Sequence, residues 1–163
     1  MSGWQVSNVV SFVSGEPFSV GSAGSALNAP GNAQRADQVK PSAAILGGIG
    51  RSSPWFDPAA FAQINEGRFG TAGFNSMRGP GLGNWDIGIY RRLRLSERHD
   101  LRFRLESFNF TNTPKFDNPR ATAGSSGFGE IQSSYGEREF RIGLRRGLRR
   151  GAQQPPCFPS GVR

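Results

Sequence analysis

The chain has 163 residues, a formal net charge of +8 and only 36% apolar residues, with 23 glycines and 11 prolines. This length allows one ordinary domain, but the apolar fraction is low for a packed globular core. Without a run of about 18 apolar residues a transmembrane helix is excluded, and the single cysteine, Cys157, excludes an internal disulfide framework and a cysteine-cluster metal site.

Residues 3–13 are rich in aromatic and β-branched side chains and predict a first strand. Gly15 and Pro17 end it. The residues from Met1 onward lack a charged segment followed by an apolar one, so we expect no signal peptide in the sequence as printed.

The segment from about residue 20 to residue 83 is rich in Gly, Ala, Ser, Asn and Pro and has no sustained periodicity. A connection of this length is usually a functional loop or a linker. Within it we expect one short helical turn, with Asp57 as its N-cap and Pro58 as its first residue. The glycine clusters at 47–50 and 79–83 lack the sequence context of a phosphate-binding loop and indicate loop backbone.

Three further strands are predicted at about residues 84–95, 100–110 and 138–144. The short polar segment Ser96–His99 makes the first two a hairpin, whereas residues 111–137 form a longer loop. After Leu144 the chain becomes rich in Arg and Pro, and we expect a flexible tail.

The predicted strands alternate apolar and strongly polar residues, so each has one face of each kind. Such a pattern suits a half-buried soluble sheet, or a barrel wall with lipid outside and water inside. Strands of about 10 residues and the order long loop, short turn, long loop are typical of an outer-membrane barrel.

No catalytic arrangement is evident, and we expect neither an enzyme nor a cofactor. The single histidine, His99, lies in the predicted turn without a recognisable nucleophile, and the carboxylates show no acid–base spacing. The Arg-rich residues 91–104 leave one alternative open, a small soluble β module that binds polyanions such as nucleic acid or acidic glycan. Because its apolar side chains would face away from any ligand held by the arginines, we favour the barrel and expect no nucleic-acid partner.

An ordered set of segments carries a family resemblance: residues 3–18, 55–61, 69–81, 84–119, 128–131 and 138–144. Taken together, they resemble the last part of TonB-dependent-receptor-like proteins of the Oar-like type. This resemblance implies an all-β fold, made of antiparallel strands of a transmembrane outer-membrane β-barrel of about 22 strands with a plug inside. This chain would supply about four C-terminal strands with long external loops, an incomplete barrel that cannot transport alone.

The resemblance also implies a location and partners. Residues 1–145 would form the barrel segment and 146–163 a disordered tail, in the outer membrane of a Gram-negative-type bacterium. The partners would be membrane lipid, the remaining strands and the plug; the full-length protein would also engage the TonB system and the barrel-assembly machinery to take up bulky substrates. The implied lipid-facing residues are Trp85, Ile87, Ile89, Leu101, Phe103, Leu105, Phe140 and Ile142. The implied lumen-facing residues are Arg102, Arg104, Glu106 and Arg141.

Overall fold

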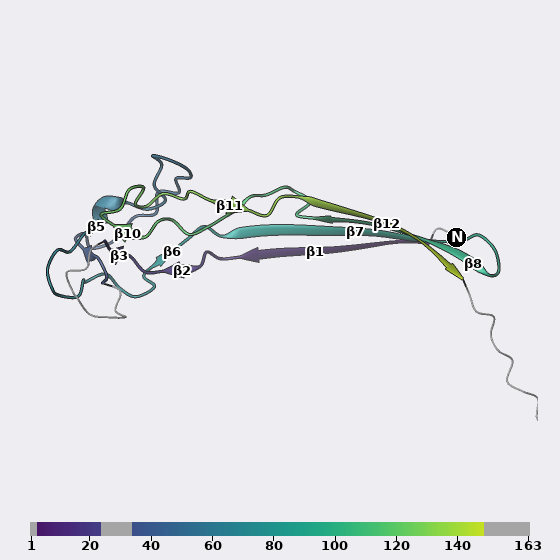
Figure 1. Cartoon of the computed structure of the whole chain (residues 1–163), viewed down its shortest axis with the longest axis horizontal. Helices are drawn as coiled ribbons and strands as arrows, with labels where there is room; N and C mark the ends of the chain where they lie inside the picture. Colours follow the sequence, from purple (N-terminus) through teal and green to yellow (C-terminus); the bar gives the residue numbers. More distant parts are fainter. Residues whose placement is uncertain (1–2, 24–33, 149–163) are drawn as a thin grey trace, which may run out of the picture.

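The computed structural model describes residues 3–23 and 34–148. Its main element is one antiparallel sheet of four long strands: β1 (Trp4–Val13), β7 (Leu82–Arg94), β8 (His99–Phe108) and β12 (Glu139–Leu148). Their spatial order is β1-β7-β8-β12, so each long strand lies beside the next long strand along the chain. The connecting segments gather at one end of the sheet, and the β7–β8 turn lies at the other (Figure 1).

The four strands and the hairpin agree with the sequence prediction, and the strand ends differ by one to four residues. β12 continues to Leu148, so that Arg146–Leu148, which the sequence assigned to the tail, pair with Leu101–His99 of β8. The backbone N–H and C=O groups of β8 at these positions need hydrogen-bond partners, and Arg146–Leu148 supply them. The composition of the tail does not reveal this pairing. The rest of the predicted tail lies outside the described residues.

β8 ends two residues earlier than predicted, at Phe108. The next residue, Asn109, has a positive φ of 48°, a conformation that Asn tolerates and that turns the chain out of the strand. Its side chain then ties the sheet to the loops. The Asn109 N–H donates to Asp86 Oδ1 (2.9 Å), while its Oδ1 accepts from Thr113 N (3.0 Å) and its Nδ2 donates to Gly136 O (2.5 Å).

The β7–β8 turn is closed by its own backbone. Leu95 N donates to His99 O (3.1 Å), and His99 N donates to Ser96 O (3.4 Å). The His99 Nδ1 also lies 3.0 Å from Ser96 Oγ. The histidine therefore has a turn-forming role in this structure.

The register of the sheet gives it two different faces, because directly paired residues point to the same side. One row across the sheet is Val6, Ile89, Leu105 and Ile142, and the adjacent row on the opposite face is Ser7, Gly88, Glu106 and Arg141. All eight residues that the sequence grouped as apolar lie on the first face, hereafter the apolar face. The four grouped as polar lie on the second, the polar face.

The apolar face has no layer of described residues packed over it. Phe140, Ile142 and Leu144 are 56%, 75% and 69% exposed, and β1 exposes Val6, Val10 and Phe12 as well. Burying apolar area is the main favourable term in folding. A face built this way therefore requires an apolar environment outside the chain.

The connecting segments fold into a compact body, the cap, made of the described residues in 14–81 and 109–138. Its first segment contains a 3-10 helix and paired two-residue strands, and its second contains one such pair. The parallel pair β3–β10 joins the two segments, with Thr122 beside Gly21 and Ala123 beside Ser22, and an isolated antiparallel bridge joins Pro54 to Glu130. The elements are β2 (Pro17–Phe18), β3 (Gly21–Ser22), β4 (Asp37–Gln38), η1 (Pro58–Ala60), β5 (Phe61–Ala62), β6 (Met77–Arg78), β9 (Lys115–Phe116), β10 (Thr122–Ala123) and β11 (Ser134–Tyr135).

The principal hydrophobic core among the described residues lies in this cap, with the ring of Phe56 (0% exposed) at its centre. Phe18, Phe61 and Phe128 surround it, with ring centroids 5.9, 5.7 and 5.3 Å away. Phe128 comes from the second cap segment, so the core needs both. The remaining buried members of the cluster are Val20, Ala36, Ala60, Ala72, Met77 and Ala123.

The helical turn expected at Asp57 is present as η1. The Asp57 Oδ1 accepts a hydrogen bond from Ala59 N at 3.0 Å, and Pro58 is the first helical residue. Lys40 Nζ contacts the other carboxylate oxygen at 2.5 Å. Both the hydrogen bond to Lys40 and the one from Ala59 N keep the pKa of Asp57 below its ordinary value.

The backbone approaches itself closely where the first cap segment joins the sheet, between Gly15 after β1 and Gly79 before β7. A Cβ atom on Gly15 would lie 1.7 Å from the carbonyl oxygen of Gly79, so only glycine fits at this position.

An ion-pair cluster holds the outer part of the cap. Arg68 donates to both carboxylate oxygens of Asp37, at 3.0 and 2.5 Å, and to Glu66 at 2.6 Å. The hydrogen bond from Arg68, with a smaller contribution from the Thr71 N–H, lowers the pKa of Asp37 below its ordinary value of 3.8.

This cluster predicts acid sensitivity of the cap. Because the folded-state pKa of Asp37 is depressed, its stabilisation is present above about pH 4 and is lost as the pH falls through the lowered pKa. Amide hydrogen exchange at the cap, measured from about pH 6 down to about pH 2, should show this loss. In Asp37→Asn the loss of amide protection at low pH should be smaller than in the unchanged protein. A variant that keeps the full acid dependence would contradict the assignment to Asp37.

Candidate functional site

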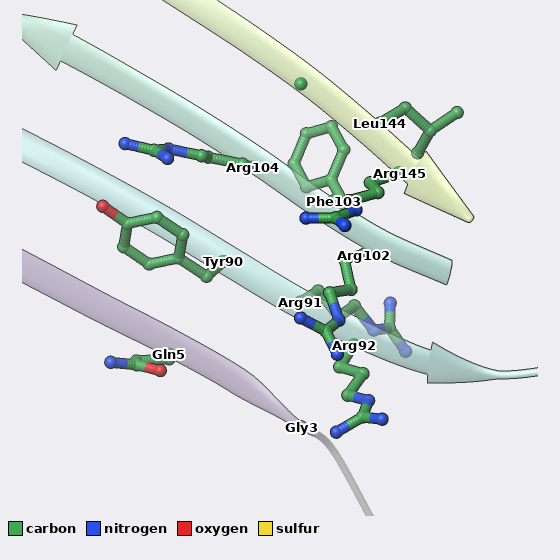
Figure 2. Close-up of a pocket in the computed structure, with 11 residues that line it drawn as sticks. Gly3, Gln5, Tyr90, Arg91, Arg92, Arg102, Phe103, Arg104, Leu144 and Arg145 are labelled. Atoms are coloured by element: carbon green, nitrogen blue, oxygen red, sulfur yellow. The ribbon is translucent and has the colours of Figure 1, made fainter. Parts of the chain in front are cut away.

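The polar face of the sheet carries a groove of about 470 Å³ towards the β7–β8 turn. Residues from all four strands line it, and Figure 2 shows how these residues are distributed over the strands. The polar residues of its lining are Gln5, Tyr90, Arg91, Arg92, Arg102, Arg104 and Arg145.

The strand register explains why arginines gather in this groove. Arg92 of β7 is paired with Arg102 of β8, which is paired with Arg145 of β12. Side chains paired across antiparallel strands have Cβ atoms about 5 Å apart, and like charges placed so are destabilising. Three adjacent arginines in one row therefore need compensating negative charge.

Asp100 supplies part of that charge. Its side chain is 3% exposed and lies between two of the arginines, with Arg92 Nε at 2.6 Å and Arg102 Nε at 3.1 Å. The space it occupies exists because its partner on β12 is Gly147, where an added Cβ would lie 2.2 Å from Asp100 Oδ1. The Asp100 carboxylate therefore holds the guanidinium groups of Arg92 and Arg102 in place.

Glu106 compensates the next row. Its Oε1 accepts a hydrogen bond from Tyr90 Oη at 2.8 Å and one from Arg104 Nη2. The Arg104 guanidinium also lies 5.8 Å from the centroid of the Tyr90 ring. Within the part of the chain that the structure describes, Arg145 is exposed and makes no ion pair.

The remaining predicted polar residue, Arg141, lies outside the groove, one row nearer the cap than Arg104. It is paired with Glu106 across the strands, and its Nε donates to Glu139 at 2.7 Å. The structure thus brings Arg102 and Arg104 into the groove and leaves Arg141 beside it. Sequence reasoning did not single out Asp100, Arg145 or Tyr90, because only the cross-strand register places them together.

Arg91 departs from the two-face pattern. It lies on the apolar face in the same row as Trp4 and Phe103, and its guanidinium carbon is 4.7 Å from the centroid of the Trp4 ring. This row is close to the turn end of the sheet. An arginine with a long apolar stem can extend its charge from such a position towards a polar boundary.

The chemistry of the groove is set by its guanidinium groups. Its ionisable lining groups are five arginines and one tyrosine. The two carboxylates next to them, Asp100 and Glu106, are occupied by ion pairs with these arginines. Over residues 3–23 and 34–148, no group of His, Cys, Asp and Glu side chains is arranged to hold a metal ion. The arrangement can bind anionic groups, since guanidinium forks match carboxylates and phosphates.

An antiparallel meander of long strands with one bare apolar face and one charged face defines a segment of a membrane β-barrel wall. The family comparison agrees: the model of the outer membrane beta barrel domain matches residues 1–143, and the chain belongs to this family. Its location is therefore the outer membrane. The four described strands do not close a barrel by themselves.

Comparison of the chain with curated proteins and with solved structures gave no match. Separately, none of the described helical segments has the length and apolar character needed to cross a membrane.

Proposed function

We propose that this chain is the C-terminal wall segment of a TonB-dependent receptor of the Oar-like type, whose full-length form takes up bulky substrates across the outer membrane. The observation that carries the proposal is the four-stranded meander, with a bare apolar face and an ordered cap at one end. The ordered resemblance of residues 3–144 to the last part of such receptors supports the finer assignment.

The two outer strands explain why the segment would need the rest of a barrel. Among the described residues, β1 pairs only with β7, and β12 only with β8. Each unpaired backbone group exposed to lipid costs several kcal/mol. Further strands must therefore cover both edges, and the segment would not transport alone.

The proposed placement puts the cap outside the cell and the β7–β8 turn in the periplasm, since external loops of such barrels are long and periplasmic turns short. Aromatic residues lie near both ends of the apolar face, as expected at the two membrane boundaries. Trp4 lies towards the turn, whereas Trp85 lies towards the cap and packs edge-on against Phe110 at 5.5 Å. The apolar face then meets lipid, and the polar face lines the lumen.

The partners in this proposal follow from that placement: membrane lipid, the remaining strands and the plug. The TonB system and the barrel-assembly machinery would act on the full-length protein. The role is that of a transport component without enzymatic chemistry, cofactor or nucleic-acid ligand.

A soluble Arg-rich module would need the apolar side chains of the sheet packed into a closed core. The observed core instead lies in the cap, while the sheet exposes Phe140, Ile142 and Leu144. Membership of the outer-membrane family also disfavours this alternative.

The test is to tag the chromosomal gene in the producing bacterium and to determine the size and fraction of the product. We expect a larger polypeptide in the outer-membrane fraction, whose upstream coding sequence contains a plug domain and more alternating strands. It should also crosslink to TonB in energised cells. Known outer-membrane and periplasmic proteins serve as fractionation controls. A product of this size in the soluble fraction, or a membrane product that never contacts TonB, would refute the proposal.

A further inference from the structure

We infer that the groove on the polar face is a binding site for a solute with two or more closely spaced anionic groups, of the phosphate or carboxylate type. The inference rests on the part of the proposed function that turns the polar face towards the lumen. It does not depend on coupling to TonB. It assigns a substrate-contacting role to Arg92, Arg102, Arg104 and Arg145.

The first argument is the balance of charge. The groove is lined by five arginines, Arg91, Arg92, Arg102, Arg104 and Arg145. Two carboxylates pair with members of this set: Asp100 with Arg92 and Arg102, and Glu106 with Arg104. Arg145 makes no ion pair in the described part of the chain, and Arg92 and Arg102 share one carboxylate. The groove therefore keeps positive charge after all its internal pairs are formed.

The second argument is the geometry of the donors. The buried Asp100 holds Arg92 and Arg102 by their Nε atoms, at 2.6 and 3.1 Å. Their exposed side chains, 45% and 54% accessible, still have terminal nitrogens available to a ligand. Guanidinium groups that are already fixed lose less entropy when an anion binds, and they bind its oxygens as forks.

The third argument is size and neutral lining. A volume of about 470 Å³ lies within the range of small-molecule sites. Gln5 and Tyr90 border the arginines and add polar groups that can orient a ligand. An aqueous lumen with a surplus of one charge also raises the local concentration of oppositely charged solutes.

The experiment measures the local potential and its relief by an anion. The samples are outer membranes of cells that make the full protein. Cys157 and any other native cysteines are replaced, and one cysteine is introduced by Gln5→Cys. The matched control is Ser11→Cys, on the same strand and the same face but nearer the cap. Each thiol is reacted with anionic sulfonatoethyl methanethiosulfonate and with its cationic trimethylammonium counterpart.

We expect the ratio of anionic to cationic reaction rates to be about tenfold higher at Gln5→Cys than at Ser11→Cys. Inorganic tripolyphosphate should slow the anionic reaction at the first position and leave the second unchanged. Adding Arg145→Gln should lower the ratio about threefold and weaken protection by tripolyphosphate. Arg141→Gln, which removes an equal charge from the same strand outside the groove, should change both much less.

Equal ratios at the two positions would overturn the inference. So would a high ratio without protection by tripolyphosphate, because the positive charge would then complement a protein segment. Equal effects of Arg145→Gln and Arg141→Gln on the rate ratio and on protection would also overturn it. The positive potential would then come from the whole polar face and not from the groove. Because these rates require neither TonB nor uptake, they fail or succeed independently of the proposed transport function.

Discussion

Replacing Phe56 by alanine is expected to lower the free energy of unfolding of the cap by about 3–5 kcal/mol. The Phe56 ring is completely buried and contacts three other phenylalanine rings from both cap segments. The substitution leaves a cavity that the surrounding short strands cannot fill, because they contain only two residues each.

Amide hydrogen exchange in outer membranes measures this effect. The hydrogen bonds from Trp55 N to Gly129 O (2.7 Å) and from Ala36 N to Val20 O (3.0 Å) should lose protection together, while those of the long strands keep theirs. Phe74→Ala is the matched control, since Phe74 lies in the same segment but is 77% exposed. Equal losses in the two variants would show that Phe56 is not the centre of the cap.

A charge on the apolar face should be the second most costly change. Val10 and Val9 are neighbours on β1 with similar exposure, 51% and 59%. Val10 lies on the apolar face opposite Trp85, and Val9 on the polar face opposite Asp86. Val10→Arg should destabilise the membrane-embedded sheet by roughly 1–3 kcal/mol, because arginine on a lipid-facing position loses its hydration.

Val9→Arg should cost much less, since its new charge points into water and lies near a carboxylate. The measurement is the denaturant concentration at which the protein unfolds from outer-membrane vesicles, together with the amount assembled in cells. Identical behaviour of the two variants would contradict the assignment of lipid and lumen to the two faces.

The long strands could be predicted from the sequence because their signal is local. Strict alternation from Leu101 to Glu106 specifies two faces regardless of which strand lies alongside. The turn at Ser96–His99 then fixes the order of its neighbours. The end of β12 could not be predicted, because Arg146–Leu148 become a strand only through the partner residues that β8 offers.

The cap and the groove depend on non-local contacts and were not predicted. Phe56 and Phe128 are 72 positions apart, and no periodicity connects them. Likewise Asp100 and Arg92 meet only after the hairpin register is set, and Gly147 leaves room for the carboxylate from a third strand. Within the cap, the helical turn at Asp57 and Pro58 could be predicted, because helix capping depends on neighbouring residues in the sequence.

The parallel pairing of Gly21–Ser22 with Thr122–Ala123 has a mechanical consequence. This pairing and the contact between Phe56 and Phe128 hold residues 14–81 and 109–138 of the cap together. We therefore expect the two segments to move as one body. If the cap faces the external medium, as proposed, a solute would meet one body, and opening it would require both segments to move together or the β3–β10 pairing to break.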